Sequence, residues 1–127
     1  MPPRLVVVCR VTTVCNLACG FCAYDRRLPF ARTTLADAQI ERLIGLMAGW
    51  HAGDRHAGDT RAACPTPPAP LLSWLGGEPL LWRDWARFSA KARERALAVS
   101  ATTNGSTLGS AAVRGQVLEH LDELTVS

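Results

Sequence analysis

The stretch Leu5-Val6-Val7-Val8-Cys9-Arg10-Val11 is followed, three residues later, by Cys15-Asn16-Leu17-Ala18-Cys19-Gly20-Phe21-Cys22. The first run is apolar and β-branched, with too little alternation for a half-exposed strand, so it predicts an interior strand of a parallel sheet. The second run places three thiols on the loop after that strand, where parallel α/β folds build their active sites. Three thiolates on one short loop can hold one face of an iron-sulfur cube and leave its fourth iron without a protein ligand.

Strand and helix signals alternate along the rest of the chain. Further strands are expected at residues 71–75, 97–101 and 124–127, and helices at residues 35–48, 82–92 and 113–121. Such alternation predicts parallel strands joined by crossover connections, which is an α/β fold. Residues 49–70 contain four prolines and no apolar period, so they are expected to form a flexible insertion.

The helical segments are recognised by apolar residues three and four positions apart. The expected apolar faces are Ile40, Leu43, Ile44 and Met47 in the first helix, Trp82, Trp85, Phe88 and Ala92 in the second, and Val113, Val117, Leu118 and Leu121 in the third. Burial of these faces against a parallel sheet predicts one domain with a single core.

Composition and charge exclude several classes of protein. At 127 residues and 48% apolar content, the chain is long enough for one globular domain. A net charge of +3 with dispersed basic residues does not suggest nucleic-acid binding. No apolar stretch has the roughly 20 residues of a membrane helix, and no signal peptide is visible, so a cytoplasmic setting without membrane association is expected. Five cysteines, three of them clustered, argue against a disulfide scaffold.

Other cysteines and the histidines are not expected to be ligands. Cys9 lies within the first strand and is expected to be a small buried residue, and Cys64 is expected to be an unpaired thiol in the insertion. His51 and His56 are also placed in the insertion, and His120 on the third helix.

The cysteine segment resembles the signature of the radical S-adenosylmethionine enzymes, in which an aromatic residue, here Phe21, precedes the last cysteine of Cys-x3-Cys-x2-Cys. Gly76-Gly77-Glu78-Pro79, after the second predicted strand, is similar to the Gly-Gly-Glu-Pro segment of that family. Thr102-Thr103-Asn104-Gly105 is similar to the Thr-Asn-Gly turn of its peptide-modifying and cofactor-maturing branch, which includes the SPASM type. Two motifs in the right order support each other, whereas an Asn-Gly turn is common in any protein.

The resemblance implies a fold and a domain organisation. The family's core is a partial (β/α)6 TIM-like barrel, and parallel strand-helix repeats over residues 1–127 would form its first half. The chain is therefore expected to be the amino-terminal part of one radical S-adenosylmethionine core domain, with the cluster loop at residues 12–24 and the carboxyl-terminal half of the barrel absent. The isolated chain is expected to show little or no turnover, because the substrate face is missing.

By the same resemblance, Cys15, Cys19 and Cys22 hold a [4Fe-4S] cluster whose unique iron chelates the amino and carboxylate groups of S-adenosylmethionine. One electron cleaves the carbon–sulfur bond and gives methionine and a 5′-deoxyadenosyl radical, which abstracts hydrogen from a substrate. The implied substrate is a peptide or protein being modified, or a cofactor precursor. A flavodoxin or a ferredoxin is the implied electron donor.

The resemblance also implies contacts to the cofactor. Phe21 would lie beside the adenine, although a core position suits an aromatic residue equally well. Gly76 and Gly77 would let the backbone approach the methionine part, and Glu78 would accept a hydrogen bond from its ammonium group. Pro79 removes a backbone donor and fixes the turn.

Polar residues at the ends of later strands are further candidates. Asn104 and Ser127 would contact the ribose or the carboxylate of the cofactor, and Asn104 equally suits a turn. Arg26, Arg27 and Arg32 follow the cysteine loop and either meet an acidic substrate group or form a solvated surface.

Other interpretations remain open from the sequence. Different branches of the family, such as those that make molybdopterin precursors or activate glycyl-radical enzymes, share the cysteine spacing. A structural zinc or iron-sulfur module without radical chemistry is a second possibility, although zinc commonly takes four ligands in two Cys-x2-Cys knuckles and no fourth cysteine stands at knuckle spacing. A truncated, inactive chain is a third.

Overall fold

A computed structural model describes residues 4–54 and 68–127. Its elements in chain order are β1 (Val6–Thr12), α1 (Asp37–Asp54), β2 (Leu71–Gly76), the short 3-10 helix η1 (Pro79–Leu81), α2 (Trp85–Glu94), β3 (Ala98–Thr103), α3 (Ala111–His120) and β4 (Glu123–Val126). The four strands form one parallel sheet in the order β1-β2-β3-β4. The predicted α/β fold is confirmed, and the arrangement is that of the start of a partial TIM-like barrel.

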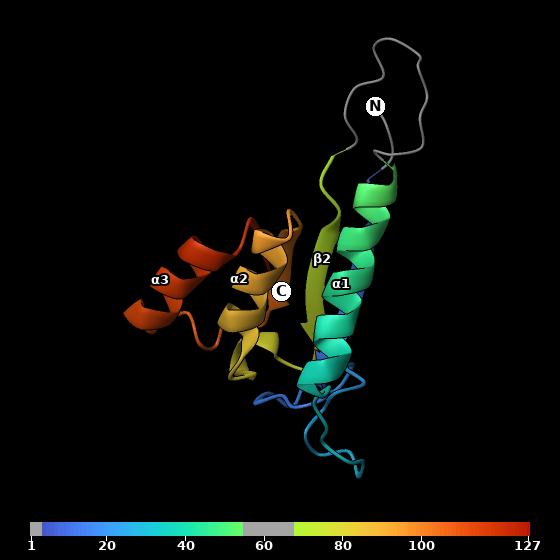
Figure 1. Cartoon of the computed structure of the whole chain (residues 1–127). Coiled ribbons are helices and arrows are strands. Elements are labelled where there is room, and N and C mark those ends of the chain that lie inside the picture. Colours follow the sequence, from blue (N-terminus) through green and yellow to red (C-terminus); the bar gives the residue numbers. More distant parts are fainter. Residues whose placement is uncertain (1–3, 55–67) are drawn as a thin grey trace.

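The helices pack on one face of the sheet, and β2 is seen between α2 and α1 in Figure 1. Alternate strand residues such as Leu72 and Val99 are fully buried against them. Trp74 of β2 is also fully buried, and its indole Nε1 donates a 2.9 Å hydrogen bond to the Ser89 hydroxyl of α2. Full burial of a large apolar side chain contributes roughly 1.5–3 kcal/mol, so this layer fixes the sheet that carries the site.

The prediction that the first strand is an interior strand is wrong for the described residues, in which β1 forms one edge of the sheet. Val6 and Val8 are 51% and 55% exposed, while Cys9 and Val11 are buried beneath α1. An uninterrupted apolar run indicates burial on both faces. Here the helices cover one face, and the described residues leave Val6 and Val8 uncovered on the other.

The first helix is longer than predicted: α1 continues past Gly49 to Asp54. A glycine inside a helix costs only about 1 kcal/mol relative to alanine. The apolar stripe of Ile40, Ile44 and Met47 extends by one more turn to His51, which is buried at 5% exposure. His51 therefore belongs to a packed helix and not to a flexible insertion.

The other predictions for the insertion and the helical faces are confirmed in part. Cys64 and His56 lie outside the described residues. Cys9 is buried as predicted, and burial raises the pKa of its thiol. Trp82 precedes α2 and stacks on Phe88 with ring centroids 5.5 Å apart. Leu118, expected on the apolar face of α3, is 84% exposed, so that assignment is wrong.

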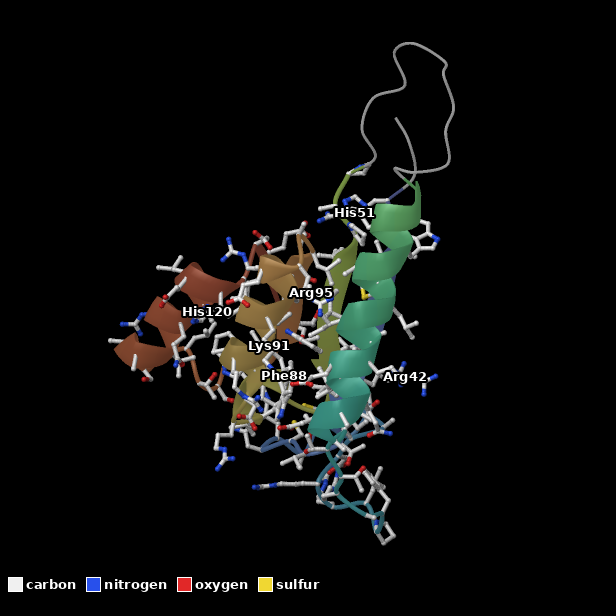
Figure 2. The ribbon with its side chains drawn as sticks, viewed as in Figure 1. Arg42, His51, Phe88, Lys91, Arg95 and His120 are labelled. Carbon is white, nitrogen blue, oxygen red and sulfur yellow. The ribbon has the colours of Figure 1, made fainter. Side chains whose placement is uncertain are left out.

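The helical face of the molecule carries compensated charges. A groove of about 260 Å³ between α1 and α2 is lined by Glu41, Ile44, Lys91, Glu94 and Arg95, and Figure 2 shows Lys91 and Arg95 along it. Lys91 forms an ion pair with Glu41 across the groove. None of the described helices combines the length and apolar character needed to cross a bilayer.

Candidate functional site

The cysteine loop is the segment between β1 and α1, residues 13–36. It leaves β1 at the carboxyl edge of the sheet, the end toward which β2 points in Figure 1. The returning chain closes the loop at its base. The Thr13 N–H donates to the Thr33 carbonyl at 2.8 Å, and the Leu35 N–H donates to the Val11 carbonyl at 2.9 Å. Both ends of the loop are thereby anchored on the sheet.

Consecutive turns present the last two cysteines of the motif. The Cys22 N–H donates to the Cys19 carbonyl at 3.0 Å, and the Asp25 N–H donates to the Cys22 carbonyl at 3.2 Å. Cys15, Cys19 and Cys22 are half-buried and carry free thiols. Each thiol is therefore available as a ligand.

All three cysteines line one cavity of about 490 Å³. The other sequence-predicted residues around it are Phe21 on the loop, Gly76 and Gly77 at the end of β2, Asn104 after β3 and Ser127 after β4. The structure thus brings together eight of the ten predicted site residues; Glu78 and Pro79 do not line the cavity. Phe21 is 96% exposed, so a core position for this residue is wrong.

The arrangement of the thiols can be compared with what a metal centre requires. In residues 4–54 and 68–127, no group of three or more His, Cys, Asp or Glu side chains converges on one metal ion. An iron-sulfur cube makes a different demand, because each thiolate binds a different iron. The sulfurs must then surround one space and need not meet at one point, and Cys15, Cys19 and Cys22 border such a space. In donor type and number, three thiols on one cavity are suited to such a cube.

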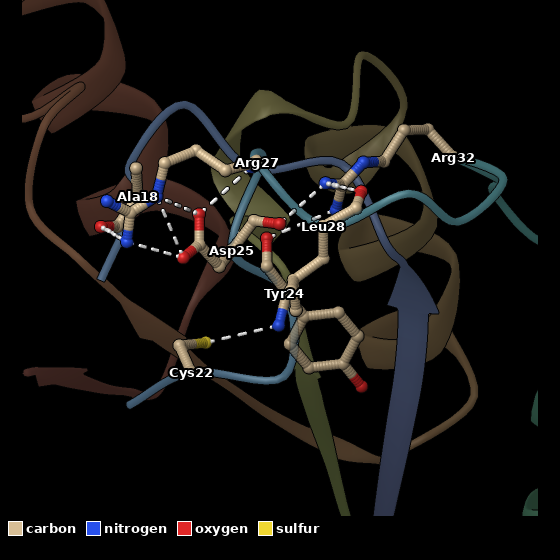
Figure 3. Close-up of polar contacts among 7 residues, drawn as sticks. All are labelled: Ala18, Cys22, Tyr24, Asp25, Arg27, Leu28 and Arg32. Atoms are coloured by element: carbon tan, nitrogen blue, oxygen red, sulfur yellow. Dashed lines mark hydrogen bonds and ion pairs between the residues drawn. The ribbon is translucent and has the colours of Figure 1, made fainter. Parts of the chain in front are cut away.

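Asp25 and Arg27 brace the cysteine loop from within (Figure 3). The Arg27 Nε donates to both Asp25 carboxylate oxygens at 3.0 Å, its Nη2 donates to Oδ2 at 2.6 Å, and its backbone N–H donates to Oδ1 at 2.9 Å. The Arg27 Nη2 also donates to the Ala18 carbonyl at 3.1 Å. Hydrogen bonds from Arg27 hold the pKa of the buried Asp25 carboxyl below its usual value, and the same pairing raises the pKa of Arg27.

Arg32 connects several backbone carbonyls of the loop by hydrogen bonds, of which Figure 3 shows those to Tyr24 and Asp25. Its Nη1 donates to the carbonyls of Thr13 at 3.2 Å and Tyr24 at 3.1 Å, and its Nη2 donates to the Asp25 carbonyl at 2.7 Å. The guanidinium carbon lies 3.8 Å from the centroid of the Phe30 ring. The donors of Arg32 are therefore used to hold the loop, as are those of Arg27, and neither side chain is a free surface cation.

Close contact between backbone segments requires glycine at positions 76 and 77. Gly76 has φ of +128°, and a Cβ there would lie 2.2 Å from the Thr12 carbonyl oxygen. A Cβ on Gly77 would lie 2.2 Å from the Val14 carbonyl oxygen. The Gly77 N–H donates to the Thr12 carbonyl at 2.8 Å, so the backbones after β1 and β2 run in contact. Contact with the first strand's loop thus explains the glycines, which also face the cavity.

Glu78 is fully buried, and three donors of this chain surround its carboxylate. Oε1 accepts from the Leu80 N–H at 3.1 Å and the Thr103 hydroxyl at 2.7 Å, and Oε2 accepts from the Asn104 N–H at 2.7 Å. Glu78 also caps η1, and Pro79 begins that helix in a buried position. The expected direct bond from Glu78 to a cofactor ammonium does not agree with this burial. The carboxylate instead acts as a structural link, here called a strut: it accepts hydrogen bonds from Thr103 and Asn104, which line the cavity.

Asn104 connects the third strand to the cysteine loop. Its side-chain Nδ2 lies 3.7 Å from the Cys15 Sγ and donates to the Asn16 Oδ1 at 3.0 Å. Its Oδ1 accepts from the Ser106 N–H at 2.9 Å, and Gly105 has φ of +79°. Asn104 therefore lies in a turn and also lines the cavity, and its contact with a cofactor stays a prediction. Ser127 continues the sheet, because its N–H donates to the Thr103 carbonyl at 2.9 Å.

Comparison with known proteins gives a structural likeness. No protein-family model matches the chain, and no curated protein matches it. The crystal structure of BtrN in complex with AdoMet and 2-DOIA superposes with a TM-score of 0.73 at 18% sequence identity. The chain has the fold of BtrN. The match covers 99% of this chain and 46% of the BtrN chain, so this chain spans less than half of that protein's length.

Several residues of the site were not predicted from the sequence. Asn16 lies inside the cysteine motif, and its Nδ2 donates to the Ser106 hydroxyl at 2.9 Å across 90 positions. Arg10 and Tyr24 also line the cavity, where the Arg10 Nη1 donates to the Tyr24 hydroxyl at 3.1 Å. Only the position of Arg10 on the strand, one place after the buried Cys9, indicated its face.

Proposed function

We propose that this chain carries the cofactor-binding part of a radical S-adenosylmethionine enzyme. The observation that carries the proposal is that three cysteines at Cys-x3-Cys-x2-Cys spacing share one cavity with Gly76 and Gly77. This cavity lies at the carboxyl edge of a parallel sheet, where such folds place their chemistry. The shared fold with BtrN, which was crystallised with AdoMet, supports it.

The residues of this chain would hold and orient the two cofactors. Cys15, Cys19 and Cys22 would bind three irons of a [4Fe-4S] cluster as thiolates. When reduced, such a cluster supplies the electron that cleaves S-adenosylmethionine into methionine and a 5′-deoxyadenosyl radical. Gly76 and Gly77 would present backbone groups to the methionine part. Phe21, exposed at the loop, would offer its ring as a wall for the adenine.

Two structural features prepare the site before any cofactor binds. The Asp25, Arg27 and Arg32 network holds the loop that carries the thiols. Glu78 fixes the backbone of Asn104 from below. Hydrogen bonds and packing that fix ligands in advance improve both affinity and geometry at metal sites. We assign to Glu78 this indirect role in place of a direct contact.

The reaction we propose is hydrogen abstraction from a peptide or protein, or from a cofactor precursor. The sequence Thr102-Thr103-Asn104-Gly105 is similar to the Thr-Asn-Gly turn of the peptide-modifying and cofactor-maturing branch, which includes the SPASM type, and this resemblance supports the choice. A flavodoxin or ferredoxin would deliver the electron. Reduced thiolate ligands suit the cytoplasm, where disulfides are rare.

Anaerobic reconstitution with iron and sulfide, followed by electron paramagnetic resonance after reduction, tests the proposal. The chain should give a [4Fe-4S] signal whose g values change when S-adenosylmethionine is added. The Cys15→Ala, Cys19→Ala, Cys22→Ala triple variant should give no such signal. Cys9→Ala is the matched control, because Cys9 is buried on the helical face of β1, and it should keep both the signal and the response.

Two outcomes would overturn the proposal. Stoichiometric zinc held by the three cysteines would make the loop a structural metal module. A cluster whose signal does not change with S-adenosylmethionine would exclude the proposed radical chemistry. The cluster would then have a structural or electron-transfer role.

A further inference from the structure

We infer that Arg10 and Tyr24 form a binding site for the carboxylate or phosphate group of a ligand in the cysteine cavity. Both side chains line the cavity of about 490 Å³, and the Arg10 Nη1 donates to the Tyr24 hydroxyl at 3.1 Å. They come from two elements, β1 and the cysteine loop. The sequence motifs do not include either residue.

The backbone register explains why Arg10 reaches the cavity. Arg10 pairs with Leu75 of β2, and both line the cavity, whereas the neighbours Cys9 and Val11 are buried on the helical face. Alternate residues of a strand point to opposite faces. Arg10 is therefore held on a rigid strand and aimed at the same face as the site.

The charge of Arg10 has no carboxylate partner within residues 4–54 and 68–127, and Arg10 is the one charged side chain among the described residues that line the cavity. Other arginines differ: Arg4 pairs with Glu123 at 3.0 Å and Arg87 with Asp37 at 2.8 Å. The bond to the neutral Tyr24 hydroxyl uses one donor of Nη1. The Nε and Nη2 donors have no hydrogen-bond partner in the described part of the chain.

The chemistry of the pair selects an oxyanion. A guanidinium presents its donors in a planar fork that matches a carboxylate or a phosphate, and such charge-assisted pairs are frequently bidentate. The Tyr24 oxygen accepts from Arg10, so its own O–H proton remains available to donate to the same anion. Donors from both side chains, the free ones of Arg10 and the Tyr24 O–H, are then available to an oxyanion at this place.

The rest of the ligand would be largely apolar where it meets the cavity. Leu17, Phe21 and Leu75 line it beside Arg10. Such a mixture of one charged group and apolar walls is typical of small-molecule sites. If the proposed function holds, on which this step rests, the ligand is the substrate, and its acidic group orients it beside the three thiols.

Nuclear magnetic resonance of the arginine Nε–Hε groups tests the site without iron or S-adenosylmethionine. The protein, labelled with nitrogen-15 arginine, is titrated with sodium acetate, with inorganic phosphate and with neutral acetamide at constant ionic strength. The Arg10 signal is assigned by its loss in Arg10→Lys. Arg42 serves as the internal control, because it is exposed on α1 and points away from the core in Figure 2.

The Arg10 signal should shift saturably with acetate or phosphate and not with acetamide, while the Arg42 signal shifts weakly and without saturation. Tyr24→Phe should lower the affinity for the anion about tenfold, as expected for loss of one hydrogen bond to a charged group. If the Arg10 shift saturates with acetate alone, the site binds a carboxylate group. If it saturates with phosphate alone, the site binds a phosphate group.

Two results would overturn the inference. Equal responses of Arg10 and Arg42, or equal responses to acetate and acetamide, would show that there is no oxyanion site. Displacement of the anion from Arg10 by S-adenosylmethionine in the cluster-loaded protein would keep the oxyanion site but overturn its assignment to a substrate. Because the first titration needs no cluster, failure of the radical chemistry alone would leave the anion site standing.

Discussion

The Thr103 hydroxyl donates a 2.7 Å hydrogen bond to Oε1 of Glu78, a carboxylate with no exposed surface. The Leu80 N–H and the Asn104 N–H complete its coordination at 3.1 and 2.7 Å. No cation pairs with Glu78 among the described residues, so these donors must compensate the buried charge. Glu78 thereby joins the end of β2 to the end of β3 directly beneath the cavity.

Replacing Glu78 by Gln should destabilise the protein strongly. An amide NH2 group cannot accept a hydrogen bond, so in either orientation the Leu80 or the Asn104 N–H loses its acceptor. The free energy of unfolding should fall by about 2–3 kcal/mol, the cost of an unsatisfied buried donor near a formerly charged group, as measured by urea denaturation. Glu119→Gln is the matched control, because that side chain is 73% exposed, and it should change stability by less than about 0.5 kcal/mol. Equal stabilities of the two variants would contradict the strut role.

Alanine at Gly77 should also destabilise the protein. The added Cβ would lie 2.2 Å from the Val14 carbonyl oxygen and 2.6 Å from its carbon, and backbone atoms cannot move aside as a flexible side chain does. We expect a loss of about 2 kcal/mol or more in the free energy of unfolding. Gly45→Ala should have the opposite sign, because nothing lies within 4 Å of a Cβ there and alanine favours a helix by about 1 kcal/mol. Thermal denaturation of both variants is the measurement, and a neutral Gly77→Ala would refute the steric explanation.

The sequence predicted the class of the fold and most of the cavity wall because both depend on chain order. Parallel strands place their carboxyl ends at one edge, so a motif directly after each strand must gather there. Cys15, Gly77 and Asn104 follow three different strands and line one cavity for this reason.

Features that depend on contacts between distant segments could not be predicted. The exposure of Val8 depends on which elements cover the second face of β1. The outward or inward direction of Glu78 depends on Thr103 and Asn104, 25 and 26 positions away. A local pattern such as Gly-Gly-Glu-Pro contains neither piece of information, and it suggested a cofactor contact where the structure has a buried strut.

Loss of the Arg32 guanidinium should loosen the cysteine loop. In Arg32→Ala, the carbonyls of Thr13, Tyr24 and Asp25 lose their common donor. Amide hydrogen exchange at Asp25 and Leu28, whose N–H groups are bonded within the loop, should become at least tenfold faster, because a hydrogen bond to a charged group contributes about 1.5–3 kcal/mol.

Arg26→Ala is the control for that measurement, since Arg26 is exposed and has no hydrogen bond or ion pair in the described residues. Its loop amides should exchange as in the parent chain. Unchanged exchange in Arg32→Ala would mean that the backbone turns alone hold the loop.

The Asp25 carboxyl should titrate below its ordinary value of 3.8. Hydrogen bonds from Arg27 favour the ionised form in the folded loop, so the pKa is lowered on folding. A lowered pKa contributes stability that is fully present above the unfolded value and is lost as the pH falls through the folded value. The Asp25–Arg27 contribution should therefore be constant from neutral pH down to about pH 5 and disappear only in stronger acid.

Carbon-13 resonance of the Asp25 carboxyl as a function of pH is the measurement for this titration. Arg27→Gln should move the midpoint upward toward the ordinary value, because the ionic donor is gone. Arg26→Gln should leave the midpoint in place. A midpoint that does not respond to Arg27→Gln would assign the lowered pKa to some other cause.

Asn104 should tune the potential of a cluster bound by the three cysteines. Its Nδ2 lies 3.7 Å from the Cys15 Sγ, to which it donates a hydrogen bond. Hydrogen bonds to ligand sulfurs stabilise the more negative, reduced cluster and raise its potential. Asn104→Ala removes this donor but keeps the backbone N–H that bonds to Glu78, so the strut beneath the cavity is preserved.

The reconstituted Asn104→Ala protein should therefore reduce at a more negative potential than the parent, in a redox titration followed by electron paramagnetic resonance. Ser127→Ala is the matched control: Ser127 lines the same cavity, but its hydroxyl bonds to the Thr103 carbonyl at 3.5 Å and, within residues 4–54 and 68–127, to no sulfur. Its potential should equal that of the parent. An Asn104→Ala potential that is unchanged, at equal iron content, would show that the amide positions the loop through Asn16 without acting on the Cys15 thiolate.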